Sequence, residues 1–206
     1  MFRNFLAKSI FFISAAMFIL MMTGCSATTR DISTDDTIHY DENYDFSDKH
    51  AIVNTLVNSL VSKPPLATRD DRPVLIVYGV ANRTSEHIET DGITDDIRQE
   101  IFQSGKARFV NKVQRDNIQS ESAYQYGGNV SAETRIQRAR QVGAEYMITG
   151  TLRSITKKEQ KQIRLKKKTL QYYSLTLELT DIQTGLIEWT DSVELAREAS
   201  KPIIGW

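Results

Sequence analysis

The segment Ser85-Glu86-His87 contains the three residue types of a hydrolase catalytic triad. A hydroxyl nucleophile, an imidazole base and a carboxylate together perform acyl transfer when the fold joins them by hydrogen bonds. Neighbours in sequence rarely form a triad, because the three groups must converge in space. We therefore interpret this segment as a solvated loop, and keep a hydrolase only as the less favoured alternative.

Other motifs with residue types of a metal or phosphate site are incomplete. His87, Glu89 and Asp91 lack the helical or hairpin spacing of structural metal sites. Gly127-Gly128 lacks the lysine and hydroxyl residue that follow the glycines of a phosphate-binding loop. Asp95-Asp96 falls in the first turns of an expected helix, where the helix dipole favours carboxylates. We predict no catalytic residue, no metal and no cofactor, and hence a protein that is not an enzyme.

Cys25 is the only cysteine of the 206 residues, which excludes an intramolecular disulfide. It follows Met22-Thr23-Gly24, which resembles the apolar and small residues of a bacterial lipobox. A lipobox requires the thiol because diacylglycerol is attached to it as a thioether before the signal peptide is cut. Arg3 and Lys8 precede an apolar run over residues 9–22. That run is shorter than the roughly 20 residues that a membrane-spanning helix needs, and is typical of a signal peptide.

The sequence thus predicts a lipoprotein signal peptide over residues 1–24 and lipidation of Cys25, with palmitate among the acyl chains. Two or more acyl chains anchor a protein stably. Ser26 follows the cysteine, where an aspartate would resemble an inner-membrane retention signal. We therefore expect an anchor in the outer membrane, facing the periplasm. The alternatives are an ordinary signal peptide with an incidental cysteine, or a cytoplasmic protein with an apolar N-terminal helix.

Charge is unevenly distributed, although 26 basic and 26 acidic side chains balance over the whole chain. Residues 26–48 contain seven Asp and Glu residues but only one Arg, and few large aliphatic side chains. Such a segment repels itself and buries little apolar surface, which predicts a flexible acidic tether over residues 25–47. Residues 48–206 are long enough for one globular domain. The balanced total charge argues against nucleic acid as a partner.

Hydrophobic spacing predicts the elements of this domain. An amphipathic helix follows Ser47, which we take as its N-cap, and ends before Pro64-Pro65. Further helices are expected around Ile93, Ile97 and Ile101, over residues 114–124 and over residues 131–142. Strands are expected over residues 74–80, at Phe109-Val110, and over residues 146–155, 170–182 and 186–195, with a tight turn at residues 181–185. The order predicts an α+β fold: a mixed or antiparallel sheet with a C-terminal three-stranded meander, and helices packed on it.

The most basic segment lies between the first two strands of this meander. Seven cations occur within residues 157–168, namely Lys157, Lys158, Lys161, Arg164, Lys166, Lys167 and Lys168. They suit the solvated tip of a long hairpin, or an electrostatic contact for an acidic partner, peptidoglycan carboxylates or lipid phosphates. Tyr172, Tyr173 and Trp189 follow, and aromatic side chains commonly anchor interfaces. The seven cations and Tyr172 form our predicted partner-binding set.

Several longer segments resemble a known family. They are residues 77–90, 93–95, 104–110, 143–150 and 184–189, and they include Gly143-Ala144-Glu145-Tyr146-Met147-Ile148-Thr149-Gly150. Together they resemble the LpoB family over most of residues 50–195. The resemblance implies an outer-membrane lipoprotein that binds the periplasmic module of a class A penicillin-binding protein. It also implies a fold like the N-terminal domain of the Tol-system propeller protein.

Members of this family activate their bifunctional peptidoglycan synthase, and so act in cell-wall synthesis and cell shape. The resemblance therefore predicts a non-enzymatic activator whose domain is monomeric. The alternative is a subunit of a curli-type lipoprotein secretion channel, which needs membrane hairpins of about ten alternating residues per strand. The charged segment at residues 157–168 does not supply such hairpins. The tether here is short and acidic, whereas the best-known members of the family have long, proline-rich ones.

Overall fold

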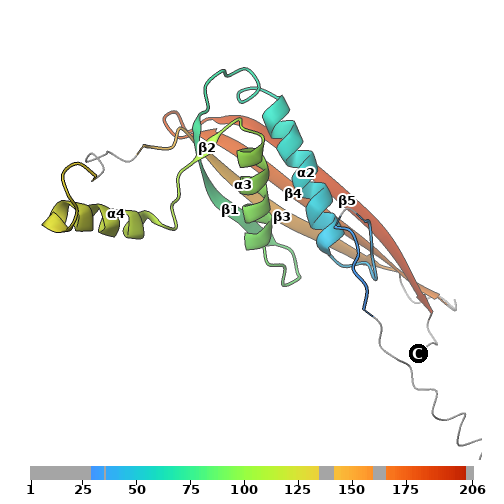
Figure 1. Ribbon diagram of the computed structural model, residues 1–206. Coiled ribbons are helices and arrows are strands. Elements are labelled where there is room, and N and C mark those ends of the chain that lie inside the picture. Colours follow the sequence, from blue (N-terminus) through green and yellow to red (C-terminus); the bar gives the residue numbers. More distant parts are fainter. Residues whose placement is uncertain (1–28, 35, 135–141, 160–165, 203–206) are drawn as a thin grey trace, which may run out of the picture. The chain divides into compact units, whose positions relative to one another are not determined.

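The computed structural model describes residues 29–34, 36–134, 142–159 and 166–202 (Figure 1). The chain divides into two units, residues 1–33 and 34–206, and every element named below belongs to the second. In the described part of the first unit, residues 29–33, all side chains are exposed. No helix within the described ranges combines the length and apolar character needed to cross a membrane.

Helix α2 (Phe46–Ser62) begins with a capping box, and its N-cap is not the predicted Ser47. The N-cap is Asp45, whose carboxylate accepts hydrogen bonds from the amides of Ser47 and Asp48 at 3.0 and 3.1 Å. The Asp48 carboxylate accepts in return from the Asp45 amide at 3.1 Å. Ser47 instead lies in the first turn, where its hydroxyl oxygen accepts from the Ile38 amide at 3.1 Å.

The five-stranded sheet is mixed, with the order β2-β1-β3-β4-β5. Its strands are β1 (Val74–Arg83), β2 (Arg108–Phe109), β3 (Tyr146–Lys158), β4 (Lys166–Asp181) and β5 (Ile187–Pro202). Strands β2, β1 and β3 run parallel, whereas β3, β4 and β5 form the antiparallel meander. Gly185, at φ +74°, closes the predicted turn between β4 and β5. The predicted fold class is therefore confirmed.

One face of the sheet carries the core, under helices α2 and α3 (Asp91–Gln103) (Figure 1). The helices contribute apolar stripes of helical period, which include Leu56 and Leu60 of α2 and Ile93, Ile97 and Ile101 of α3, all at 0% exposure. The strands contribute alternate residues, among them Leu175, Leu177 and Leu179 of β4, also at 0%. The helical stripes and the period-two pattern of β4 were both expected from the sequence.

Helix α4 (Arg115–Tyr124) and the π-helical segment η1 (Gln125–Asn129) have no buried residue. They follow β2 and lie outside the layer formed by α2 and α3 (Figure 1). The helix expected over residues 131–142 lies for the most part outside the described residues.

Candidate partner-binding surface

The sheet face opposite α2 and α3 is open along the meander. No described side chain of β3, β4 or β5 that points to this face is buried. Strand alternation places Leu170, Tyr172, Ser174 and Thr176 on this face, and Tyr173, Leu175 and Leu177 on the helix face. We call this surface the open hairpin face; it comprises the outward residues of β3, β4 and β5.

Strand register arranges the open hairpin face in rows across the three strands. The row nearest the hairpin end is Lys157–Leu170–Glu198, the next is Ile155–Tyr172–Ala196, and the third is Arg153–Ser174–Glu194. Directly opposed side chains on one face are in contact distance of each other. The rows therefore form an apolar centre with cations on β3 and carboxylates on β5.

The apolar centre is exposed to solvent. Ile155 is 54% exposed and Leu170 is 51% exposed, on the part of the β3–β4 hairpin that extends beyond the last β1–β3 pair, Arg83 with Arg153. Tyr172 lies between them, and the Glu194 carboxylate that accepts its phenol proton in a hydrogen bond raises its pKa. On the acidic side, Glu198 forms an ion pair with Lys168 at 2.7 Å. An apolar centre with an aromatic anchor and a charged rim is the usual composition of a protein-binding surface.

The structure separates the residues of the predicted partner-binding set. Lys157 and Lys158 are exposed at the end of β3, and Lys168 is exposed near the start of β4. The backbones of Lys166 and Lys167 pair with Pro202 and Lys201 of β5. Lys161 and Arg164 lie outside the described residues. Of this set, Lys157, Lys168 and Tyr172 belong to the open hairpin face.

Two aromatic residues that were expected to lie near the partner site are inaccessible to a partner. Tyr173 and Trp189 are 2% and 7% exposed, and both belong to the helix face. The expectation that they anchor a partner was wrong, because strand alternation turns them into the core. Conversely, Ile155, Leu170 and Ala196 were missed. Each is unremarkable alone, and only the register of the three strands brings them beside Tyr172.

The hydrolase-like triple does not form a catalytic chain. The Glu86 carboxylate accepts hydrogen bonds from the Tyr173 hydroxyl at 2.7 and 2.8 Å and from the Gln171 amide nitrogen at 2.8 Å. Ser85 and His87 are exposed, and within the described chain no hydrogen bond joins them to Glu86 or to each other. Glu86 therefore lies in a loop, as predicted, but it is half-buried and fastens the loop to β4, whereas the sequence predicted a solvated segment.

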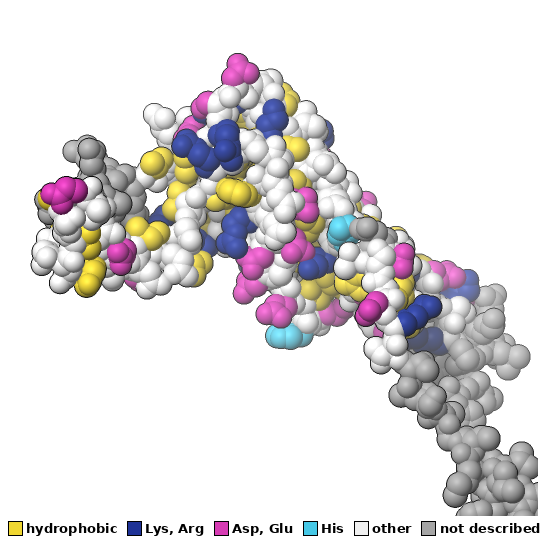
Figure 2. All heavy atoms as spheres, in the orientation of Figure 1, with side chains coloured by type: hydrophobic (Ala, Val, Ile, Leu, Met, Phe, Trp, Pro, Cys, Tyr) yellow, Lys and Arg dark blue, Asp and Glu magenta, His cyan; other side chains and the backbone are white. Residues whose placement is uncertain are grey.

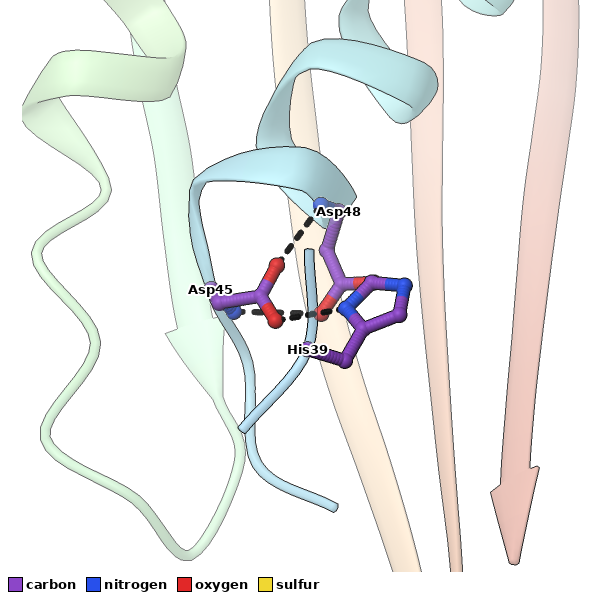
Figure 3. A group of neighbouring side chains, drawn as sticks. All are labelled: His39, Asp45 and Asp48. Atoms are coloured by element: carbon purple, nitrogen blue, oxygen red, sulfur yellow. Dashed lines mark hydrogen bonds and ion pairs between the residues drawn. The ribbon is translucent and has the colours of Figure 1, made fainter. Parts of the chain in front are cut away.

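A second cluster, His39, Asp45 and Asp48, is the only group in the described ranges compact enough to suggest a metal site (Figure 3). His39 Nδ1 lies 2.6 Å from Asp45, and both carboxylates already accept amide protons of the capping box. The Arg197 guanidinium of β5 pairs with Asp48 and lies 3.7 Å from Asp45. Because a protein cation already faces these carboxylates, we assign the cluster to helix capping and to fastening the preceding segment.

Residues 36–45, which we call the strap, contact β5. Arg197 donates a hydrogen bond to the Asn43 carbonyl at 2.9 Å, and Lys201 pairs with Glu42 at 2.8 Å. The Lys201 ammonium group holds the pKa of Glu42 below its usual value. Part of the segment predicted to be a flexible tether is therefore attached to the sheet. Two of its carboxylates, Glu42 and Asp45, are paired with Lys201 and Arg197, more than 150 residues away in sequence, and no local pattern reveals these partners.

A protein-family model described as the peptidoglycan-synthase activator LpoB matches residues 48–195. No curated protein sequence matches the chain. Among solved structures, the LpoB C-terminal domain from Salmonella enterica is 21% identical, with a TM-score of 0.46 over 72% of this chain and 98% of that one. The Escherichia coli domain is 20% identical, with a TM-score of 0.45 over 73% and 99%.

A third similar structure is the lipoprotein GNA1162 from Neisseria meningitidis. It is 14% identical, with a TM-score of 0.38 over 62% of this chain and 84% of that one. The family model covers β1 to β4, β5 up to Leu195, α2 from Asp48 onward, and α3. The expected similarity to the Tol-system propeller protein stays a prediction.

Proposed function

Because the chain belongs to the LpoB family of peptidoglycan-synthase activators, we propose that it binds a class A penicillin-binding protein through the open hairpin face. The protein acts without chemistry of its own: it changes the activity of the synthase by binding it. The observation that carries this proposal is the solvent-facing apolar row of exposed Ile155, half-buried Tyr172 and exposed Ala196, with cations on β3 and carboxylates on β5 beside it.

Activation by binding requires a difference in affinity between two states of the synthase. A bound protein accelerates an enzyme only if it prefers the active conformation over the resting one. A sheet face distinguishes two conformations of a partner because the hydrogen bonds between its strands hold its side chains in fixed rows. The partner conformation that matches the rows is therefore bound in preference to the others.

We also propose that the chain is a lipoprotein of the outer membrane, anchored through Cys25 and facing the periplasm. The supporting features are the lipobox-like residues before Cys25 and the serine that follows it. Because the strap, residues 36–45, contacts β5, ten residues of the predicted tether, 26–35, separate it from Cys25. At roughly 3.3 Å per residue, such a tether extends about 35 Å at most. The globular unit is thus kept near its membrane, where it meets the periplasmic module of the synthase as a monomer.

The contact surface is tested with a chain that begins at Ser26 and with a detergent-solubilised class A synthase. We expect Tyr172→Ala to weaken binding at least tenfold, because a buried interface aromatic typically contributes about 2 kcal/mol or more. Thr180→Ala, on the same face of β4 but away from the apolar row, is the matched control and should change affinity less than twofold. Equal binding by the Tyr172→Ala variant and the wild type would exclude the open hairpin face as the contact.

The basic hairpin end is tested separately. Changing Lys166, Lys167 and Lys168 to Glu should slow association rather than speed dissociation, because rim charges act mainly on the encounter rate. The slowing should diminish in high salt, since the Debye length falls to about 3 Å at 1 M. Association at the wild-type rate would show that these lysines are only a solvated hairpin end.

A further inference from the structure

We propose that the free edge of β2 is a second docking site, where an extended acidic segment of a partner protein adds a strand to the sheet. This site lies at the opposite sheet edge from β5 and is independent of the open hairpin face. The inference rests on the edge hydrogen-bonding groups, on the hollows on both sides of that edge, and on the charge around it.

The backbone N–H and C=O of Phe109 point away from β1, toward the outer side of β2. The amides of Arg108 and Val110 donate to the β1 carbonyls of Pro73 and Leu75, each at 2.9 Å. In a parallel ladder the residue between two such donors points its N–H and C=O to the other side. Among the strands of the described residues, β2 pairs with β1 alone. An incoming strand therefore finds a donor and an acceptor at Phe109.

Hollows lie on both sides of the same short segment. One, of about 800 Å³, is lined by Arg98, Gln99 and Phe102 of α3 together with Gln114. The other, of about 290 Å³, is lined by Val74, Ile118 and Val142. Phe109, Val110 and Asn111 line both hollows. Alternate side chains of an added strand point to opposite sides, so each side has a hollow to receive them.

The two hollows differ in chemistry, which specifies the occupant further. In the larger one, Arg98 is already paired with Asp95 of the same lining at 2.8 Å. The smaller one has an aliphatic floor and is also lined by Arg108 and Arg115. Phe102 and Val113 are 57% and 71% exposed beside the larger hollow. The matching strand alternates acidic and aliphatic side chains, with its acidic side toward Arg108 and Arg115 and its aliphatic side toward Phe102 and Val113.

Charge favours an acidic partner over a second copy of this chain. Figure 2 shows Lys and Arg side chains beside exposed hydrophobic ones over the position of β2 in Figure 1. In the described part of the chain, Lys106, Arg108, Lys112 and Arg115 form no ion pair with a carboxylate. Lys112 lies over the Tyr78 ring at 4.7 Å. Two copies paired edge to edge would bring these cations together, which is unfavourable.

The probe is a capped nine-residue peptide in which Glu and Val alternate, and the control peptide has Lys in place of every Glu. We expect the Glu peptide to bind the chain from Ser26 at least tenfold more tightly than the Lys peptide. It should also slow hydrogen exchange of the Phe109 amide. Absence of binding by the Glu peptide, or exchange slowed elsewhere but not at Phe109, would overturn the proposal.

A matched pair of variants tests the strand addition itself. Phe109→Pro removes the outward N–H and leaves the ladder donors Arg108 and Val110, whereas Phe109→Val keeps that N–H. The Pro variant should bind the Glu peptide at least tenfold more weakly than the Val variant, and equal binding would contradict the proposal. If circular dichroism shows that the Pro variant is unfolded, the double variant Arg108→Glu with Arg115→Glu is used instead. It should also bind the Glu peptide at least tenfold more weakly than the Val variant, and equal binding would again contradict the proposal.

Two further outcomes distinguish this site from the proposed synthase contact. Phe109→Pro, or the double charge reversal, should leave affinity for the synthase within twofold of wild type, while Tyr172→Ala should leave peptide binding unchanged. Loss of peptide binding in Tyr172→Ala would overturn the β2 site, because the peptide would then occupy the open hairpin face. A concentration-dependent dimer that the peptide dissociates would show that the edge pairs with a second copy instead.

Discussion

Tyr172 and Tyr173 are neighbours in sequence with opposite environments. Tyr173 is 2% exposed and donates its hydroxyl hydrogen to Glu86, and burial together with that carboxylate raises its pKa. Tyr172 faces solvent between Ile155 and Ala196. The alternation was visible in the sequence, but which of the two faces would be open was not, because that depends on where α2 and α3 pack.

The two tyrosines give a matched test of this difference. Tyr173→Phe removes the hydroxyl that donates to Glu86, and we expect it to lower the free energy of unfolding by about 1–3 kcal/mol, the usual effect for a hydrogen bond to a charged group. Tyr172→Phe should change it by less than about 0.5 kcal/mol, as for other surface substitutions. Urea denaturation followed by circular dichroism measures both. Equal effects would mean that the Glu86 contact does not stabilise the fold.

Asp191 of β5 predicts a dependence of stability on pH. Hydrogen bonds from Lys63 and Ser59 lower its pKa from 3.8 to about 2. A carboxyl group with a lowered folded-state pKa stabilises the fold above its ordinary value, and this contribution is lost as pH falls from about 4 towards 2. Because its side chain is 33% exposed, we discount the contribution to about 1 kcal/mol.

The corresponding variant is Asp191→Asn. Near pH 6 it should be less stable than wild type by about 1 kcal/mol, and the difference should shrink as pH approaches 2. Thermal unfolding at pH 6, 4 and 2.5 measures the difference. Asp31→Asn, at an exposed position of the other unit, is the control and should show no such convergence. A difference that is constant over this range would contradict the assigned ion pair.

At the scale of elements, the sequence alone predicted those features that depend on residues close together in the chain. The stripes of α2 and α3, the buried core of β1 and the turn at residues 181–185 follow from spacing and turn chemistry, and the structure confirms them. The N-cap residue of α2 and the attachment of the strap to β5 could not be predicted in this way. Asp45 and Glu42 look like two more acids of a tether until Arg197 and Lys201 are known to lie beside them. Partners so distant in sequence leave no local signal.

Gly150 of β3 shows how closely the central strands pack. A Cβ atom there would lie 2.7 Å from Leu177 Cδ2 and 2.9 Å from Val80 Cγ2, so a neighbour would have to move. We expect Gly150→Ala to lower the free energy of unfolding by about 1–3 kcal/mol, the usual effect of adding a carbon atom to a tightly packed core. Gly92→Ala is the control, since nothing lies within 4 Å of the position that its methyl group would take, and it should be neutral or stabilising. Thermal denaturation compares them, and an unaffected Gly150→Ala variant would show that the sheet is looser than described.

At the scale of the whole molecule, the anchor and the tether are predictions from the sequence. Cys25→Ala should release the protein into the soluble periplasmic fraction or leave it unprocessed at the inner membrane, because the thiol is the attachment point of the lipid. Cell fractionation and labelling with a fatty acid measure this. Fatty-acid labelling at the wild-type level in the variant would contradict the assignment of Cys25.

The central claim is that this chain activates a peptidoglycan synthase through the open hairpin face. Its most direct test is the rate of glycan-chain polymerisation by a purified class A penicillin-binding protein, measured with and without the chain from Ser26. We predict that the wild type and the Thr180→Ala control raise the rate equally, and that Tyr172→Ala raises it at least tenfold less at the same subsaturating concentration. A synthase rate that the wild type leaves unchanged, or that Tyr172→Ala raises as much as the wild type does, would contradict this claim.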